Sequence, residues 1–180
     1  MKLVLATPLY PPDIAPPAPY VKELAKRLSN GHQVTIVTYG KLPEKVAGVS
    51  IVAVPKNRIL PLRLLDYTFA LMQAARKADI VYAQNGASVE LPLLLVSLFT
   101  STPIILCFGD VAAHARTETH AILRFIERMA SVRAKSLVHD TPPPRPIIMP
   151  LKPRPEQELF VYEMAWKEHL SKLERLFVTV

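Results

Sequence analysis

Hydrophobic positions along this chain follow two alternating patterns. Short apolar runs rich in β-branched residues predict strands, and apolar residues at spacings of three and four predict amphipathic helices between them. The predicted strands are residues 2–6, 33–38, 49–54, 79–83, 103–108 and 135–138. The predicted helices are segments around Val21–Leu28, Leu62–Lys77, Val89–Phe99 and Ile122–Val132.

This alternation indicates the fold class. Near-continuous apolar strands separated by helices are typical of a parallel sheet covered on both faces. We therefore expect an α/β protein over residues 1–140, with a doubly wound, mainly parallel, Rossmann-like sheet in three α/β/α layers. A length of 180 residues is enough for one well-buried core and short for two.

The pattern changes after residue 140. Residues 141–155 hold seven prolines in fifteen positions, which predicts an extended linker because proline can neither continue a helix nor pair in a central strand. Residues 156–180 predict one terminal amphipathic helix. Its apolar face consists of Leu159, Tyr162, Trp166, Leu170, Leu173 and Phe177. We expect that face to pack on the first domain or on a partner.

Charge and hydrophobicity patterns indicate which partners and which cellular location to expect. The formal net charge of +7 favours anionic partners such as nucleotide phosphates or anionic lipids. No basic stripe interleaved with aromatic residues is found, so nucleic acid is not expected. The longest apolar stretch, residues 91–99, is too short to span a bilayer, and the amino-terminal residues lack the pattern of a secretion signal. We expect a cytoplasmic location.

Metal and cofactor motifs are not found in the sequence. Cys107 is the single cysteine and lies in an apolar run, which predicts a buried structural thiol. His114 and His120 are six positions apart and do not share a helix face, so we expect no metal site. The few glycines form neither a dinucleotide-binding motif nor a P-loop.

Ligands of open parallel sheets bind beyond the carboxyl ends of the strands. The candidate loops are therefore those that follow the predicted strands. They are residues 7–19, 39–40, 84–86 and 109–114.

Four segments of these first 140 residues occur in an order typical of one enzyme family: MKLVLATPLYPPDIAPPAPYVKELAKRL, GHQVTIVTYG, DIVYAQN and PIILCFGD. They closely resemble the amino-terminal domain of the family 4 GT-B glycosyltransferases. The terminal MAWKEHLSKLERLF is similar to the last helix of that family, which crosses back from the second domain to the first. The resemblance implies retaining transfer of a sugar from a nucleotide-sugar, which is a substrate, so no cofactor is expected.

Two departures from the family pattern limit this implication. The family's first loop typically reads PPxxGG, and its glycine backbone approaches the donor; here Ala15 and Pro16 stand in those places. Both side chains add bulk, and proline has no N–H to donate. Relatives also carry a donor-binding domain with two glutamates eight positions apart, a spacing that no glutamate pair in this sequence has.

The resemblance gives two catalytic candidates. Gly109 and Asp110 match the family's GD after the fifth strand, and we expect Asp110 to orient the acceptor. His114 lies four residues later, and its unperturbed pKa would suit acid-base work. A surface histidine without a role is the alternative interpretation.

Further residues are binding candidates. The backbone around Asp13, Ala15 and Pro16 would border the donor phosphates, although Asp13 also fits a turn-forming acid. Asn85 and Gly86 could bind an acceptor or form an ordinary turn pair. Residues 56–67 mix basic residues with leucines, which suits docking to a membrane that carries lipid-linked acceptors, or a core-facing helix with solvated arginines.

We therefore expect a glycosyltransferase-like acceptor-side domain that takes part in sugar transfer only with a donor-binding partner protein. The alternative is a non-catalytic binding or scaffold protein, a relic of such an enzyme, for which a homodimer through the terminal helices is one arrangement. A shortened form of a longer protein is the third hypothesis. A peripheral position at a membrane is compatible with each.

Overall fold

The computed structural model describes residues 1–15, 17–146 and 155–180 of the chain. These residues divide into two compact units, Met1–His139 and Asp140–Val180. The first unit contains the whole sheet and five helices among its described residues.

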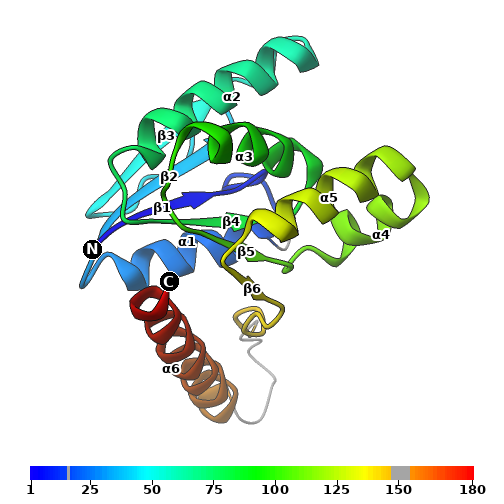
Figure 1. The fold of residues 1–180 in the computed structure, drawn as a ribbon. Coiled ribbons are helices and arrows are strands. Elements are labelled where there is room, and N and C mark those ends of the chain that lie inside the picture. Colours follow the sequence, from blue (N-terminus) through cyan, green and yellow to red (C-terminus); the bar gives the residue numbers. More distant parts are fainter. Residues whose placement is uncertain (16, 147–154) are drawn as a thin grey trace. The chain divides into compact units, whose positions relative to one another are not determined.

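The first unit is built on a six-stranded parallel sheet (Figure 1). Its strands are β1 (Lys2–Ala6), β2 (Gln33–Tyr39), β3 (Val49–Val54), β4 (Ile80–Gln84), β5 (Ile104–Cys107) and β6 (Ser136–Val138). The spatial order is β3-β2-β1-β4-β5-β6, which is the Rossmann order. The prediction of a doubly wound parallel sheet is confirmed.

Helices cover both faces of this sheet (Figure 1). Helix α1 (Pro17–Leu28) lies on one face, and α2 (Leu60–Ala75), α3 (Ala87–Phe99) and α5 (Ala121–Arg133) lie side by side on the other. The chain moves one way across the sheet from β1 to β3 and the other way from β4 to β6. Because parallel crossovers are right-handed, this reversal places the helices of the two halves on opposite faces.

The alternating side chains of the strands supply both packed layers. Val4 and Ala6 of β1 belong to one buried cluster with Tyr67 and Leu71 of α2 and Leu93 of α3. The intervening positions of the strands point to the other face. There, the hydroxyl groups of Tyr20 on α1 and Tyr82 on β4 are 2.8 Å apart.

Cys107 lies on this second face of the sheet and is fully buried, as predicted. Burial raises the pKa of its thiol above the ordinary value. The reactive thiolate is therefore scarce at neutral pH.

Residues 109–114, which we expected to form a loop, instead begin a helix. Helix α4 (Val111–Thr119) starts directly after Asp110, whose side chain accepts a hydrogen bond from the backbone N–H of Ala113 at 3.0 Å. An aspartate at this position is a favoured N-cap, because it satisfies an N–H that lacks a partner within the helix. The expectation of a loop past Asp110 was wrong.

Helix α5 does not present its predicted apolar residues to the core. Ile122, Phe125 and Val132 are 75%, 63% and 72% exposed, whereas Ala130 is buried. Helix α2 buries Tyr67, Leu71 and Ala75 in the core but leaves Leu62 and Leu65 exposed. The spacing of apolar residues predicts that a helix has an apolar face, but not which surface that face meets.

The second unit contains α6 (Pro155–Thr179), close to the predicted terminal helix. Residues 141–146 of the predicted linker contain no helix or strand, and residues 147–154 lie outside the described residues. The surface that the apolar face of α6 meets stays a prediction. No helix in the described part of the chain is long and apolar enough to cross a membrane.

Candidate functional site

A groove of about 330 Å³ lies at the carboxyl edge of the sheet. The loop after β1 and the first residues of α3 and α4 form much of it, because parallel strands end at the same edge. The residues that line it are Pro8, Leu9, Tyr39, Lys56, Arg63, Gly86, Ala87, Ser88, Asp110, Ala113, Arg116, Thr117 and Leu123. A larger hollow of about 460 Å³ lies between α2 and the first three strands, lined by Lys2, Gln33 and Phe69 among others. The smaller groove is the candidate site, since only it lies where this architecture binds ligands.

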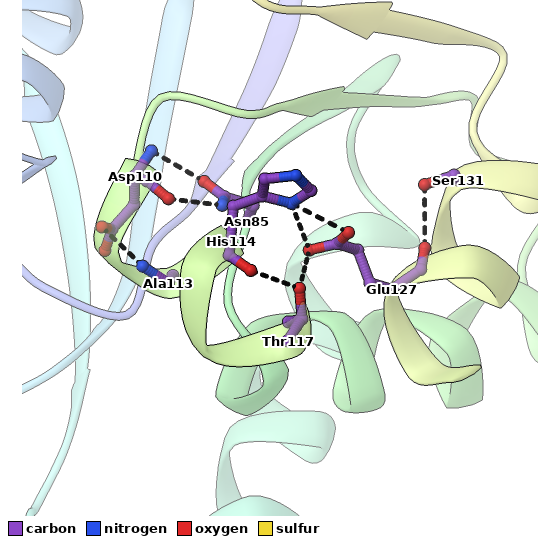
Figure 2. Close-up of polar contacts among 7 residues, drawn as sticks. All are labelled: Asn85, Asp110, Ala113, His114, Thr117, Glu127 and Ser131. Atoms are coloured by element: carbon purple, nitrogen blue, oxygen red, sulfur yellow. Dashed lines mark hydrogen bonds and ion pairs between the residues drawn. The ribbon is translucent and has the colours of Figure 1, made fainter. Parts of the chain in front are cut away.

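Asn85 and Asp110 connect the loops after β4 and β5. The side-chain Nδ2 of Asn85 donates to the backbone carbonyl of Asp110, and the backbone N–H of Asp110 donates to Oδ1 of Asn85, both at 2.9 Å (Figure 2). Asn85 is fully buried, so its amide group holds the two loops together and is not presented to the groove.

Asp110 combines this loop contact with its N-cap role. Its Oδ1 accepts from Ala113, while Asp110 and Ala113 both line the groove. Oδ2 of Asp110 has no hydrogen bond among the residues that the structure describes. The site therefore offers one carboxylate oxygen at a position fixed by two backbone contacts and a cap. The half-buried Gly109 precedes it.

Gly86 is required by its backbone conformation. Its φ of +130° lies in a region that L side chains rarely adopt. A Cβ there would also lie 3.7 Å from Cγ of Pro8 and 3.9 Å from Cβ of Ala113. Gly86 thus permits a tight turn from β4 into α3 at the wall of the groove.

His114 is paired with a residue that the sequence did not indicate. Its Nδ1 lies 3.0 Å from Oε1 of Glu127 on α5, and Thr117 donates to Oε2 of Glu127 at 2.9 Å (Figure 2). The hydrogen bond with Glu127 raises the pKa of His114 above its ordinary value. The charged pair is therefore complete at low pH and is lost as the pH rises through that raised pKa. His114 is not among the residues that line the groove.

Glu90 on α3 is the second acid that the sequence did not indicate. It is fully buried, and neither of its carboxyl oxygens makes a hydrogen bond of normal geometry among the described residues. Burial raises its pKa to about 7, the backbone N–H of Gly86 partly offsets this, and the nearby charge of Glu127 adds to it. Glu90 therefore takes up or releases a proton near neutral pH behind the groove.

Tyr39 lines the groove and hydrogen-bonds a backbone carbonyl in the first turn of α3. Its hydroxyl donates to the backbone carbonyl of Ser88 at 2.7 Å. That carbonyl would ordinarily accept from the residue four positions later, which is Pro92 and has no N–H. The guanidinium of Arg63 lies 5.6 Å from the centre of the Tyr39 ring, a cation–π distance.

The start of the first loop lines the groove through Pro8 and Leu9, whereas its predicted donor-side residues do not line it. Asp13 forms an ion pair with Lys56 at 2.7 Å, and Lys56 lines the groove. The carbonyl of Ala15 accepts from the N–H of Ala18 at 2.9 Å and so helps to begin α1. Pro16 lies outside the described residues. Within the described part, no group of three or more His, Cys, Asp or Glu residues could hold a metal ion.

A comparison with protein-family models gives a match for this chain. The model of the glycosyl transferase 4-like domain matches residues 17–158, well over half of the chain. The chain belongs to the glycosyl transferase 4-like domain family. No curated protein sequence matches this glycosyl transferase 4-like chain.

Solved structures agree with this family at the level of the fold. Anabaena Alr3699/HepE, solved with UDP and glucose, is 16% identical with a TM-score of 0.50, over 76% of this chain and 37% of that chain. An alpha-glucosyltransferase solved with UDP and a 13-mer DNA is 12% identical with a TM-score of 0.41, over 76% of this chain and 36% of that chain, a likeness too weak to bear on function. This glycosyl transferase 4-like chain thus spans about a third of the length of these two structures.

Among the residues of the site that were not predicted, one had a sequence pattern that could have indicated it. Glu90 is the one charged residue between Ala87 and Phe99, and a lone acid in an apolar helix indicates either a surface position or a special burial. Arg63 lies in the basic segment 56–67 that the sequence indicated, although not as a residue of the groove. Glu127 and Arg116 gave no signal, because each occurs among other charged residues.

Proposed function

We propose that this chain supplies the acceptor side of a retaining glycosyltransferase and works with a donor-binding protein. The observation that carries the proposal is an open groove at the carboxyl edge of a glycosyl transferase 4-like fold, lined by a fixed carboxylate. HepE was solved with UDP and glucose, and this chain corresponds to about 37% of its length. The second wall of a two-domain cleft would come from the partner.

The residues of the groove suggest a division of roles in such a cleft. Asp110 would orient the acceptor hydroxyl through Oδ2, since its other oxygen caps α4. Backbone groups around Asp13 and Ala15 would border the donor phosphates. His114 would act by holding α4 against α5 through Glu127, because it does not itself reach the groove.

A complementation assay tests this proposal. An extract of source cells that lack this chain is supplied with radiolabelled nucleotide-sugars, with and without the purified chain. We expect sugar transfer only when the chain and the extract are combined, and at least tenfold less with Asp110→Ala than with the unaltered chain (roughly 1.4 kcal/mol or more). Asp66→Ala, which removes a half-buried carboxylate of α2 that pairs with Arg58 and does not line the groove, is the control. Equal transfer with and without the chain would contradict an enzymatic role and favour a binding or scaffold protein.

A second observation favours peripheral membrane association. The outer faces of the neighbouring helices α2, α3 and α5 expose large apolar side chains, including Phe69 at 64%, Leu98 at 60% and Phe125 at 63%. Arginines such as Arg124 and Arg128 adjoin them on α5. Exposed apolar side chains beside basic ones are typical of helices that lie on anionic membrane surfaces.

Vesicle flotation tests this second proposal. We expect the chain to float with phosphatidylglycerol vesicles and to float much less with phosphatidylcholine vesicles. Phe69→Ser combined with Phe125→Ser should lower the bound fraction about fivefold or more, because two apolar anchors are lost. Leu42→Ser, at an exposed loop position, is the control. Absence of flotation with anionic vesicles would overturn the proposal.

A further inference from the structure

Strand β3 forms a free edge of the sheet. It pairs with β2 alone and is the first strand in the order β3-β2-β1-β4-β5-β6 (Figure 1). Residues 40–48 join β2 to β3 without a helix, although parallel neighbours are usually connected through one. Because this connection is a short loop, it places no helix beside the edge strand.

The backbone polar groups of β3 point alternately towards β2 and away from it. The carbonyl of Val54 accepts from the N–H of Gly40 at 2.9 Å, so the groups of Val54 face β2. Every second residue of a paired strand directs its groups the same way. The N–H and C=O groups of the intervening residues, Val49, Ile51 and Ala53, therefore point out of the sheet.

Most of these outward groups have no partner. The N–H of Val49 donates to the carbonyl of Val46 at 3.2 Å. The N–H groups of Ile51 and Ala53 and the three outward carbonyls make no hydrogen bond among the residues that the structure describes. An unpaired edge is a template for another strand, and monomeric proteins commonly protect it with charges or prolines. Residues 49–54, VSIVAV, contain neither.

We propose that β3 pairs antiparallel with β3 of a second copy of this chain, so that the two sheets become one. A second copy fits because the free groups match their own two-fold image. Ile51 of each copy exchanges two backbone hydrogen bonds with Ala53 of the other, which uses every free donor of both edges. The ladder ends at the next outward positions, because the N–H of Val49 is already bonded and Pro55 has no N–H.

Val52 lies at the two-fold axis of this arrangement. It is 40% exposed and lines the hollow beneath α2 together with Phe69, which is 64% exposed. In the inferred register Val52 is opposite Val52 of the second copy at a non-hydrogen-bonded position, where opposing side chains lie closest. Two β-branched side chains stabilise such a pair, and no like charges meet along residues 49–54.

The size of this contact sets its strength. Strand β3 has six residues, whereas a stable dimer usually buries about 800 Å² on each copy. We therefore expect a reversible dimer with a Kd of about 10–100 μM. Because the two-fold axis is perpendicular to the shared sheet, α2, α3 and α5 of both copies lie on the same side of it.

Sedimentation equilibrium of the full chain from about 1 to about 200 μM tests the dimer. We expect the average mass to rise from the 20.1 kDa of one chain towards twice that value. Val52→Lys and Val52→Glu each place like charges opposite one another, so each alone should weaken association about fivefold or more. An equal mixture of the two variants should restore it, which excludes misfolding. Val132→Lys, at an exposed position of α5, is the control and should change association less than twofold.

Cysteine substitution tests the register. Val52→Cys brings two thiols opposite each other, where the Cα separation suits a disulfide. We expect mild oxidation to give a covalent dimer on non-reducing electrophoresis. Ser50→Cys, on the same face of β3, is the matched control, because its two thiols would lie roughly 13 Å apart along the strands. Cys107, the single native cysteine, is fully buried.

The outcomes decide the proposal independently of sugar transfer. A monomer at every concentration overturns it. Association that Val52→Lys leaves unchanged also overturns it and would assign the dimer to another surface, such as α6. Covalent dimers of Ser50→Cys that form as fast as those of Val52→Cys would contradict the register. Ala53→Pro removes an outward donor and keeps the ladder with β2, so it should weaken association about tenfold while circular dichroism shows a folded chain.

Discussion

Asn85→Ala is expected to lower the free energy of unfolding by about 3 kcal/mol, because it leaves the backbone N–H and carbonyl of Asp110 without their partners. Both hydrogen bonds are 2.9 Å long and Asn85 is fully buried, so water cannot simply replace the lost amide. Urea-induced unfolding followed by circular dichroism measures the change. A matching fall in the melting temperature of about 6–12 °C is expected for a chain of this size.

The control for this substitution is Asn30→Ala, at an exposed turn after α1. Its effect should stay within about 0.5 kcal/mol, as is usual for surface positions. Because Asn85 also fixes Asp110 at the groove, the variant should lose sugar transfer in the complementation assay even at temperatures where it is folded. A loss of stability below about 1 kcal/mol would show that the two loops are held by other contacts.

Glu90→Gln is expected to stabilise the protein above neutral pH and to have little effect in acid. The folded protein releases the proton of Glu90 at a pKa of about 7, whereas the ordinary value is 4.5. Between these values the folded state binds more protons than the unfolded state, so the stability of the unaltered protein falls as the pH rises. The difference in pKa corresponds to about 3 kcal/mol, which glutamine escapes because it has no proton to lose.

Unfolding in urea at pH 5, 6, 7 and 8 checks this prediction. The advantage of Glu90→Gln should be below about 1 kcal/mol at pH 5 and should approach about 3 kcal/mol at pH 8. Glu127 and His114 also face this group, so its titration shifts if either one is replaced. Glu118→Gln, an exposed acid on α4, serves as the control. A stability advantage that does not vary between pH 5 and pH 8 would contradict a raised pKa of Glu90 in the folded protein.

The main elements of the first unit were predictable because each depends on neighbours in the chain. The run before Thr7 and the run from Gln33 predicted β1 and β2, and the spacing of Val21, Leu24 and Leu28 predicted α1. Helix α4 was missed because its start depends on one side chain, Asp110, turning back to cap Ala113. An aspartate before Val-Ala-Ala is a weak signal for such a cap, because acids are common in loops.

The candidate site was predictable in position but not in composition. The rule that ligands bind at the carboxyl ends of parallel strands identified the loops of Asp110 and Gly86, which do line the groove. It also identified the loop of Tyr39, but it gave no reason to select Arg63 or Arg116, since their meeting in the groove depends on which strands are neighbours. The exposed apolar residues of α5 show the same limit, because the sequence predicted an apolar helix face but not whether that face would be buried.

The sequence by itself determined a layered α/β domain with parallel strands, the edge at which its loops gather, and a family whose first-loop glycines are replaced here. Only the tertiary structure decided that Asn85 joins Asp110, that Glu127 meets His114, that Glu90 is buried, and that two arginines share one groove. The physical reason is the separation along the sequence of the residues that interact. Helix and strand periodicity is set by residues a few positions apart, whereas hydrogen-bond partners, burial and local charge are set by the order in which distant strands pair.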